Sequence, residues 1–301
     1  MTEQDVRANA EYMAAHLKEY GWEYVVVDIQ WYAYGAGSMR SRFQYIPFSK
    51  LEMDEYSRLL PCPERFPSAA GGEIRMLHQA IQAAGRPIVL SLSPGPALIE
   101  KAWEYEKYAN MWRITDDFWD HWPLLLNMFE RCELWQNHVS KGCYPDCDML
   151  PLGCVGRGFG DERNTRFTKE EQITMMTLWC VFRSPLMIGA KLPDLDEWTL
   201  SLLTNREVLA LLSDSCRGEQ IVRDSSHSVW RSVNEKDGSR YAALFNFRDE
   251  TAGVGVSLEE LGVKESGCRL RELWTGEENM TVEGRIEAQI AAHGAKLYRI
   301  L

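Results

Sequence analysis

Residues 109–120, Ala-Asn-Met-Trp-Arg-Ile-Thr-Asp-Asp-Phe-Trp-Asp, combine the residue types that a sugar-binding site needs. Arg113 and Asp117 come at the end of a short apolar run typical of a strand, and Trp112 and Trp119 lie beside them. Aromatic rings can stack on the C–H face of a pyranose, a carboxyl can transfer protons, and an arginine can hold hydroxyls. The same residues also fit a helix N-cap with a solvated first turn, because Asp is favoured at both places. Other parts of the chain decide between these two interpretations.

Composition narrows the classes of partner. The chain has 301 residues, 45% of them hydrophobic and 26% charged, which is ordinary for a soluble globular protein with one large and one smaller domain. A net charge of −11 disfavours nucleic acid and anionic membranes, which bind clustered Lys and Arg. No apolar run approaches the ~20 residues that span a bilayer. The N-terminus lacks the pattern of a secretory signal, so we expect a cytoplasmic protein unless the given chain is truncated there. Its oligomeric state cannot be predicted.

Cysteine and histidine spacing gives no sign of a metal site. The eight cysteines are too sparse for a disulfide scaffold, and reduced thiols are expected. Cys143 and Cys147 form the closest pair, but no second Cys/His pair stands at zinc-site spacing. The six histidines are scattered, and His16 and His78 fall within predicted helices. We therefore expect no cofactor, and a metal-dependent barrel hydrolase is the less favoured alternative.

The pattern up to residue 213 alternates helices with short apolar strands. An N-terminal helix that ends at Gly21 is followed by predicted strands at 24–28, 87–92, 109–114, 147–150 and 185–189, and by predicted helices at 73–84, 97–107, 117–134 and 169–182. Such alternation indicates parallel βαβ units. Polar residues gather where the strands end: Asp28, Ser93, Arg113 with Asp117, and Asp148. Active sites of (β/α)₈ barrels lie at that end of the strands.

After residue 215 the pattern changes to β-rich runs separated by turn residues, which is typical of a small antiparallel sandwich. We therefore predict two domains, a barrel over 1–213 and a β-sandwich over 214–301. Five predicted strands are fewer than the eight of a closed barrel, and the segment is shorter than the ~250 residues that such a barrel typically takes. The predicted fold class is α/β, an incomplete (β/α)₈ TIM-type barrel followed by a sandwich.

Five segments in order carry a resemblance to a known family. They are Tyr24-Val-Val-Val-Asp-Ile-Gln-Trp31, Asp54-Glu-Tyr-Ser-Arg-Leu-Leu-Pro61 with Arg65-Phe-Pro67, Trp112-Arg-Ile-Thr-Asp-Asp117, Asp146-Cys-Asp-Met-Leu150, and Leu178-Trp-Cys-Val-Phe-Arg-Ser-Pro-Leu-Met187. Together they resemble glycoside hydrolase family 27, the α-galactosidase and α-N-acetylgalactosaminidase group. The resemblance implies a barrel with a C-terminal sandwich and retaining hydrolysis of terminal α-linked galactose-like sugars, without a cofactor.

The resemblance also implies roles for individual residues. Asp117 resembles the family's general acid/base, four residues after the sugar-binding Arg113. Asp28 and Asp148 resemble aspartates that bind sugar hydroxyls after the second and seventh strands. Ser93 stands in the loop that faces the substituent on C2 of the sugar in galactose-specific members. Ser93 here could leave room for a larger substituent or a different sugar, or the loop could be a proline-rich turn without ligand contact.

The departures from the family pattern concern catalysis directly. The family's nucleophile is an aspartate in a Lys-Tyr-Asp or Lys-Val-Asp motif after the fourth strand, and no such motif occurs in this chain. The first, third and fourth strands are missing from the pattern. A retaining glycosidase needs two carboxyl groups ~5–5.5 Å apart, so activity of this chain is expected to be impaired. The alternatives are an enzyme whose recorded sequence has lost segments, a non-catalytic sugar-binding pseudoenzyme, and a decaying gene product without a stable fold.

Overall fold

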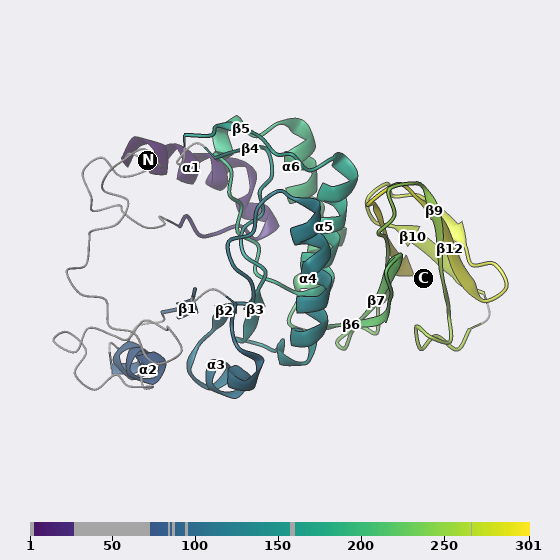
Figure 1. Ribbon diagram of the computed structural model, residues 1–301, viewed down its shortest axis with the longest axis horizontal. Coiled ribbons are helices and arrows are strands. Elements are labelled where there is room, and N and C mark those ends of the chain that lie inside the picture. The colour runs from purple at the N-terminus through teal and green to yellow at the C-terminus, as the bar shows by residue number, and fades with distance from the viewer. Residues whose placement is uncertain are drawn as a thin grey trace.

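The computed structural model describes residues 3–26, 73–83, 85, 88–93, 96–156, 160–265 and 267–301. Figure 1 shows an α/β part that contains the helices α1 to α6 and, next to α4 and α5, a C-terminal part made of strands. No helix among the described residues combines the length and apolar character needed to cross a membrane.

The α/β part is built of short strands and longer helices. Its main elements are α1 (Glu3–His16), α2 (Glu73–Ala83), β1 (Ser91–Leu92), α3 (Ala102–Tyr108), β2 (Met111–Arg113), α4 (Trp122–Trp135), β3 (Tyr144–Asp146), β4 (Cys154–Val155), β5 (Arg163–Asn164), α5 (Lys169–Phe182), α6 (Glu197–Leu203) and α7 (Arg206–Leu209). Within the described ranges this part also has 3₁₀ turns at Lys18–Tyr20, Ile99–Lys101, Gln136–His138, Leu192–Asp194 and Ala210–Leu212. Helices α2 and α5 match the ranges predicted from the sequence, whereas α3 and α4 begin later than predicted.

Three parallel strands form the sheet that positions the predicted site. Their order is β1-β2-β3, and Leu92, Trp112 and Pro145 lie side by side in the register. A parallel bridge between Leu150 and Ile188 follows in the direction of the predicted last strand. Parallel pairing brings the carboxyl ends of all these segments to one edge, as in a (β/α)₈ barrel.

Several predicted strands are wrong in extent. Residues 24–26, the described part of 24–28, form no strand, and in 88–92, the described part of 87–92, only Ser91 and Leu92 do. The predicted strand 147–150 lies earlier, at Tyr144–Asp146, and 185–189 contributes a single bridge. The helix predicted from 117 begins at Trp122, with Pro123 in its first turn. An apolar run becomes a buried parallel strand only where neighbours cover both of its faces, and Tyr24 and Val26 are 78% and 67% exposed.

The C-terminal part consists of antiparallel strands. They are β6 (Cys216–Arg223), β7 (His227–Asn234), β8 (Arg240–Asn246), β9 (Ala252–Ser257), β10 (Arg269–Glu272), β11 (Glu278–Met280), β12 (Arg285–Ile290) and β13 (Ala295–Ile300). Six of them form one sheet in the order β11-β10-β13-β8-β7-β6, and β9 pairs with β12. These strands contain the runs predicted as a sandwich.

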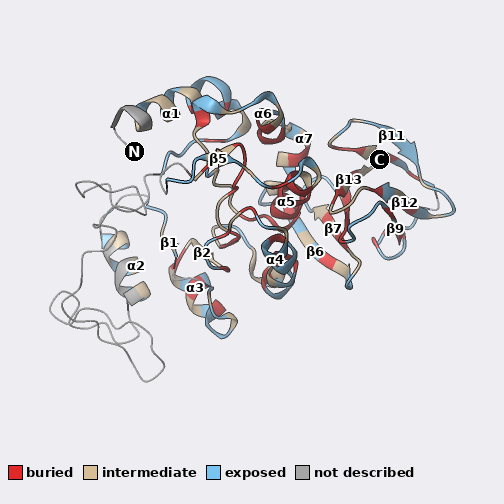
Figure 2. Cartoon of the chain, turned by 45° about the horizontal axis from the view of Figure 1, so that its top comes forward, coloured by how far each residue is buried: buried red, intermediate tan, exposed pale blue. Residues whose placement is uncertain are grey.

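The six-stranded sheet separates two apolar cores. Trp230, Ala243 and Phe245 belong to the core shared with the helices, whereas Val229 and Leu244 belong to the core under β9 and β12. This alternation follows from the two-residue period of a strand, which sends successive side chains to opposite faces. Figure 2 shows buried residues gathered along α5 and the adjoining strands, while α1 is largely exposed.

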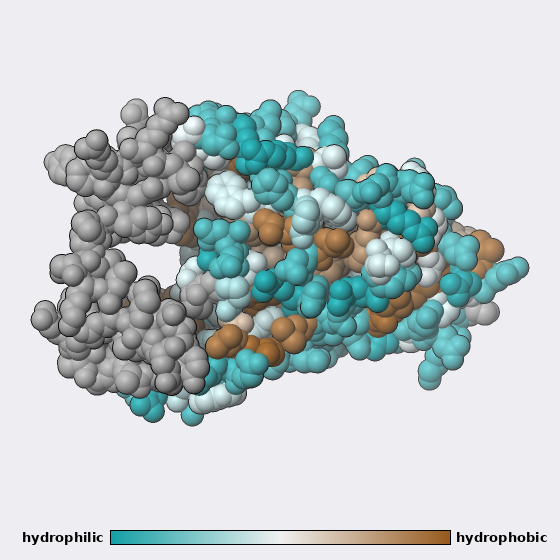
Figure 3. All heavy atoms as spheres, viewed as in Figure 1, coloured by the Kyte–Doolittle hydropathy of each residue, from teal (hydrophilic) through white to brown (hydrophobic). Residues whose placement is uncertain are grey.

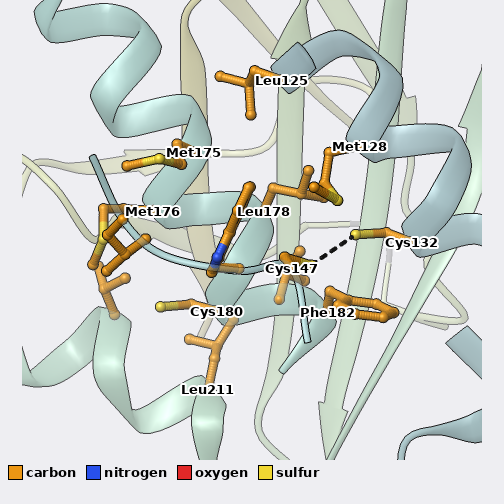
Figure 4. Packing of buried hydrophobic residues seen from close by; sticks show 14 of the residues in the cluster. Leu125, Met128, Cys132, Cys147, Met175, Met176, Leu178, Cys180, Phe182 and Leu211 are labelled. Atoms are coloured by element: carbon orange, nitrogen blue, oxygen red, sulfur yellow. Dashed lines mark hydrogen bonds between the residues drawn. The ribbon is translucent and has the colours of Figure 1, made fainter. Parts of the chain in front are cut away.

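Helix α5 is the centre of the larger core. Figure 4 shows Met175, Met176 and Leu178 of α5 packed among buried side chains, with Cys132 and Cys147 close by. The sulfur atoms of Cys132 and Cys147 lie 3.6 Å apart, and all seven cysteines within the described ranges are free thiols. A core of this kind fixes the strand ends that carry Asp146 and Asp148 on either side of Cys147.

His293 joins the two parts of the molecule. Its ring stacks on Trp122 at the start of α4, with centroids 3.9 Å apart. One ring nitrogen lies 2.9 Å from Glu171 of α5 and the other lies 2.8 Å from Asp249. These contacts hold the sandwich against the N-terminal ends of two helices.

Candidate functional site

Arg113 is the centre of the candidate site at the carboxyl end of the sheet. Its Nη1 lies 2.9 Å from Asp117 Oδ1 and 3.6 Å from Asp148 Oδ1. The backbone of β2 fixes this position, because Ala97 donates to the Arg113 carbonyl and Ile114 donates to the Asp146 carbonyl. The Arg113 and Asp148 side chains are 16% and 15% exposed, whereas Asp117 is 75% exposed. One arginine therefore gathers two of the predicted carboxylates where solvent can reach.

The buried Nε of Arg113 has no hydrogen-bond partner within the described part of the chain. A buried donor without a partner costs about 1–3 kcal/mol. This Nε donor is shielded from solvent, while the Nη1 end of the guanidinium holds the carboxylates.

Asp148 has a backbone conformation unusual for a residue other than glycine. Its φ is 71°, in the left-handed region, where such strain costs on the order of 1–3 kcal/mol. Its Oδ2 accepts the Phe118 N–H at 2.7 Å, and its carbonyl accepts Trp179 Nε1–H at 3.3 Å. The Phe118 bond holds the side chain beside Arg113, and the Trp179 bond holds the backbone of Asp148.

Asp146 is a buried residue two positions before Asp148, and the sequence analysis gave it no role. It is 3% exposed, and its Oδ1 accepts the N–H of Asp148 at 2.9 Å. Burial, reinforced by the charge of Asp148, raises the pKa of Asp146 to about 7, against the opposing effects of that N–H bond and of Arg113. The Asp-Cys-Asp spacing directly after a strand was the available signal, because alternate residues of an extended segment share a face.

Asp120 is a second buried carboxylate that the sequence did not single out for a role. It accepts bonds from Arg163 Nη2 at 2.8 Å and from the Arg166 amide at 2.6 Å. Burial alone would raise the pKa of Asp120, but these bonds hold it below its ordinary value. Asp120 therefore ties the β4–β5 hairpin to the loop that follows β2.

The remaining residues predicted for the site either lie outside the cluster around Arg113 or fall outside the described part of the chain. Ser93 is exposed directly after β1, at the same sheet edge as Arg113, and no contact joins it to the carboxylates described above. Asp28 lies outside the described residues. The expectation that Trp112 presents a ring to a sugar is wrong, because it is 0% exposed and packs against Tyr105 and Trp135. Trp122 stacks on His293 at the domain junction.

No group of three or more potential metal ligands occurs among the described His, Cys, Asp and Glu residues. The cluster of Arg113, Asp117, Asp146 and Asp148 has one fixed cation for three carboxyls. Such a cluster can exchange hydrogen bonds with hydroxyls and can transfer protons.

Acidic and basic side chains stand at the carboxyl edge of a barrel-type parallel sheet, and a β-sandwich follows; comparison with known families identifies this arrangement as the α-galactosidase architecture. The sequence profile described as Alpha galactosidase A matches residues 67–214, and that of the Alpha galactosidase C-terminal beta sandwich domain matches residues 224–300. These matches confirm the predicted fold class, an incomplete TIM-type barrel with a sandwich.

Comparison with individual proteins leads to the same family as the profile matches. A β-L-arabinopyranosidase of glycoside hydrolase family 27 from Geobacillus stearothermophilus is 38% identical, with a TM-score of 0.87, over 100% of this chain and 92% of that one. A variant of that enzyme in complex with arabinose is also 38% identical, with a TM-score of 0.87, over 100% and 93% of the two chains. Alpha-galactosidase 2 of Arabidopsis thaliana is 27% identical over 228 residues, 74% of this chain and 54% of that protein. The chain spans between 28% and 54% of the length of the curated relatives compared with it. It belongs to glycoside hydrolase family 27.

Proposed function

We propose that this chain binds the terminal residue of a galactose-like glycoside and is a retaining glycosidase of α-galactosidase type whose turnover is impaired. Asp117 is the acid/base, Arg113 and Asp148 bind hydroxyls, and Asp28 and Ser93 belong to the periphery of the same site. The division into a barrel over 1–213 and a sandwich over 214–301 is part of this proposal.

The observation that supports the proposal is the contact of Arg113 with both Asp117 and Asp148. A charged donor between two carboxylates offers donors and acceptors together, as vicinal sugar hydroxyls require.

The class of sugar follows from configuration. L-Arabinopyranose has the ring configuration of D-galactopyranose but lacks the hydroxymethyl group on C5, and the Geobacillus relative is named for that sugar. We therefore propose α-D-galactopyranosides and β-L-arabinopyranosides as the two ligands to compare. Calorimetric titration with the methyl glycosides of both sugars tests binding, and the absence of saturable binding to either would refute the proposal.

Impaired turnover follows from the missing Lys-x-Asp motif. Without a nucleophile, an added small anion can take its place: azide attacks the anomeric carbon, the aryl–oxygen leaving group departs with the bonding electrons, and Asp117 protonates it. We expect turnover of an aryl α-galactoside only with azide, and a β-galactosyl azide product. Efficient hydrolysis without azide would contradict impairment. Saturable binding without turnover in azide would favour the alternative, a sugar-binding pseudoenzyme.

The role of Asp117 predicts how leaving groups respond to its replacement. In azide-supported turnover, Asp117→Asn should lower the rate with a phenyl galactoside by about 10²–10⁴-fold, the usual contribution of general acid catalysis. A dinitrophenyl galactoside should be much less affected, because its leaving oxygen needs little protonation. Asp116→Asn, at the exposed neighbouring position, is the matched control and should leave both rates unchanged. Equal losses for both substrates would contradict the assignment.

A further inference from the structure

The candidate site depends on a left-handed turn at Asp148. Two acceptors of Asp148 act outside the turn: its side chain binds the Phe118 amide and its carbonyl binds Trp179. The Trp179 bond holds the backbone of Asp148 at its carbonyl, and a second bond, inside the turn, holds it at its amide. That bond is the one from the Asp148 N–H to Asp146 Oδ1, 2.9 Å long.

We propose that Asp146 is a positioning residue whose buried carboxyl, by accepting the Asp148 amide, sets the turn that presents Asp148 to Arg113 and to the Phe118 amide. Short side chains of Asp and Asn commonly bind the backbone two residues further on in this way. The effect on the site is indirect, since Asp146 is buried and reaches the sugar-facing groups through Asp148. Only the consequence for sugar binding rests on the proposed function.

The charges around Asp146 link the turn to proton uptake. Arg113 comes from β2, Asp117 from the loop after it, and Asp148 from the same segment as Asp146. Three ionised carboxylates would leave two negative charges in excess of the arginine. A proton on Asp146 removes one of them and still leaves Oδ1 free to accept the Asp148 amide. The proton thereby reduces repulsion between Asp146 and Asp148 across the turn.

Two variants separate the hydrogen bond from the charge. Asp146→Asn keeps an oxygen in place of Oδ1 and removes the ionisable group, whereas Asp146→Ala removes both. Amide hydrogen exchange measured by NMR reports the result without any ligand. We expect the Phe118 amide to exchange about tenfold or more faster in Asp146→Ala, since it loses its acceptor on Asp148, and to stay near the wild-type rate in Asp146→Asn.

The Ile114 amide is the internal control. It donates to the backbone carbonyl of Asp146 and should keep its wild-type exchange rate in both variants. Equal acceleration of Ile114 and Phe118 would indicate general loosening and overturn the proposal, as would an unchanged Phe118 rate in Asp146→Ala.

Should Asp146→Ala fail to fold, Asp146→Asn alone still tests the proposal. The chemical shift of the Phe118 amide should titrate near neutral pH in the wild type and stay flat in Asp146→Asn. The same titration in both proteins would refute the proposal.

A titration with methyl α-D-galactopyranoside keeps the two proposals apart. If the wild type binds, Asp146→Ala should weaken binding about tenfold or more and Asp146→Asn should restore most of it at acidic pH. Equal binding by wild type and Asp146→Ala would refute the positioning role. If the wild type does not bind while the Phe118 exchange changes as expected, the proposed function fails and the positioning role stands.

Discussion

One ionisable residue, Asp146, should give this chain an unusual dependence of stability on pH. Burial raises the pKa of Asp146 to about 7, whereas in the unfolded chain it is near 4. Between these values the folded chain binds more protons, so the free energy of unfolding falls as the pH rises through the window and levels off above it. The loss is of order a few kcal/mol, because each pKa unit corresponds to about 1.4 kcal/mol. Urea unfolding at pH 5 and pH 8 should show this loss, and Asp146→Asn should remove most of it.

Two other bonded carboxyls, Asp120 and Asp224, do not interfere with that test. The pKa of Asp120 is held below its ordinary value despite burial, by Arg163 and the Arg166 amide. Bonds from Ser226 lower the pKa of Asp224 to about 2. The stability that these two groups contribute is lost only as the pH falls below about 4. A slope between pH 5 and pH 8 that persists in Asp146→Asn would therefore show that Asp146 is not its source.

Residue patterns alone identified part of the candidate site. The spacing of Arg113 and Asp117 placed them together, and Asp148 followed from its position after a strand; the structure brings all three into contact. Their roles remain predictions. Asp146 was missed because its altered proton affinity comes from burial by distant segments, and Trp112 was misjudged because local sequence does not distinguish a core ring from an exposed one.

At the scale of elements, helix α5 was predicted within its observed bounds because its start signal is local. Thr168 accepts the Glu171 N–H, and Glu171 Oε2 accepts the Thr168 N–H, which is a complete capping box. Glu171 also binds His293 through its other oxygen, so this cap supports the contact with the sandwich. The short strands lack such signals, since their extent depends on neighbours far away in the sequence.

Removal of the cap should weaken the helix and the junction together. Thr168→Ala leaves the Glu171 amide without its acceptor, and we expect the free energy of unfolding to fall by about 1 kcal/mol. Thr168→Ser keeps the hydroxyl and should stay close to the wild type. Chemical denaturation measures both, and a Ser variant as unstable as the Ala variant would show that packing of the threonine methyl group, not the cap, is responsible.

At the scale of the whole molecule, strand-like apolar segments remain open to solvent. Tyr24 and Val26 are 78% and 67% exposed, and Val89 in the segment before β1 is 62% exposed. The face drawn in Figure 3 is largely hydrophilic, with separate brown patches. Runs of β-branched residues are ordinarily buried inside parallel sheets. Their exposure here is what a barrel with fewer strands than its family would show.

Exposed apolar runs bind hydrophobic dyes and promote self-association. We expect the native chain to enhance the fluorescence of anilinonaphthalene sulfonate, and the triple substitution of Tyr24, Val26 and Val89 by Thr to reduce that signal severalfold. The melting temperature should change little, because exposed side chains lose little burial. Met280 and Val282 on the sandwich are 59% and 69% exposed and supply the control, since replacing both by Thr should leave the signal unchanged. A dye signal that falls equally in both variants would place the apolar surface elsewhere. A dye signal that persists in the triple variant, together with a non-cooperative melt, would favour a decaying gene product over a folded glycosidase.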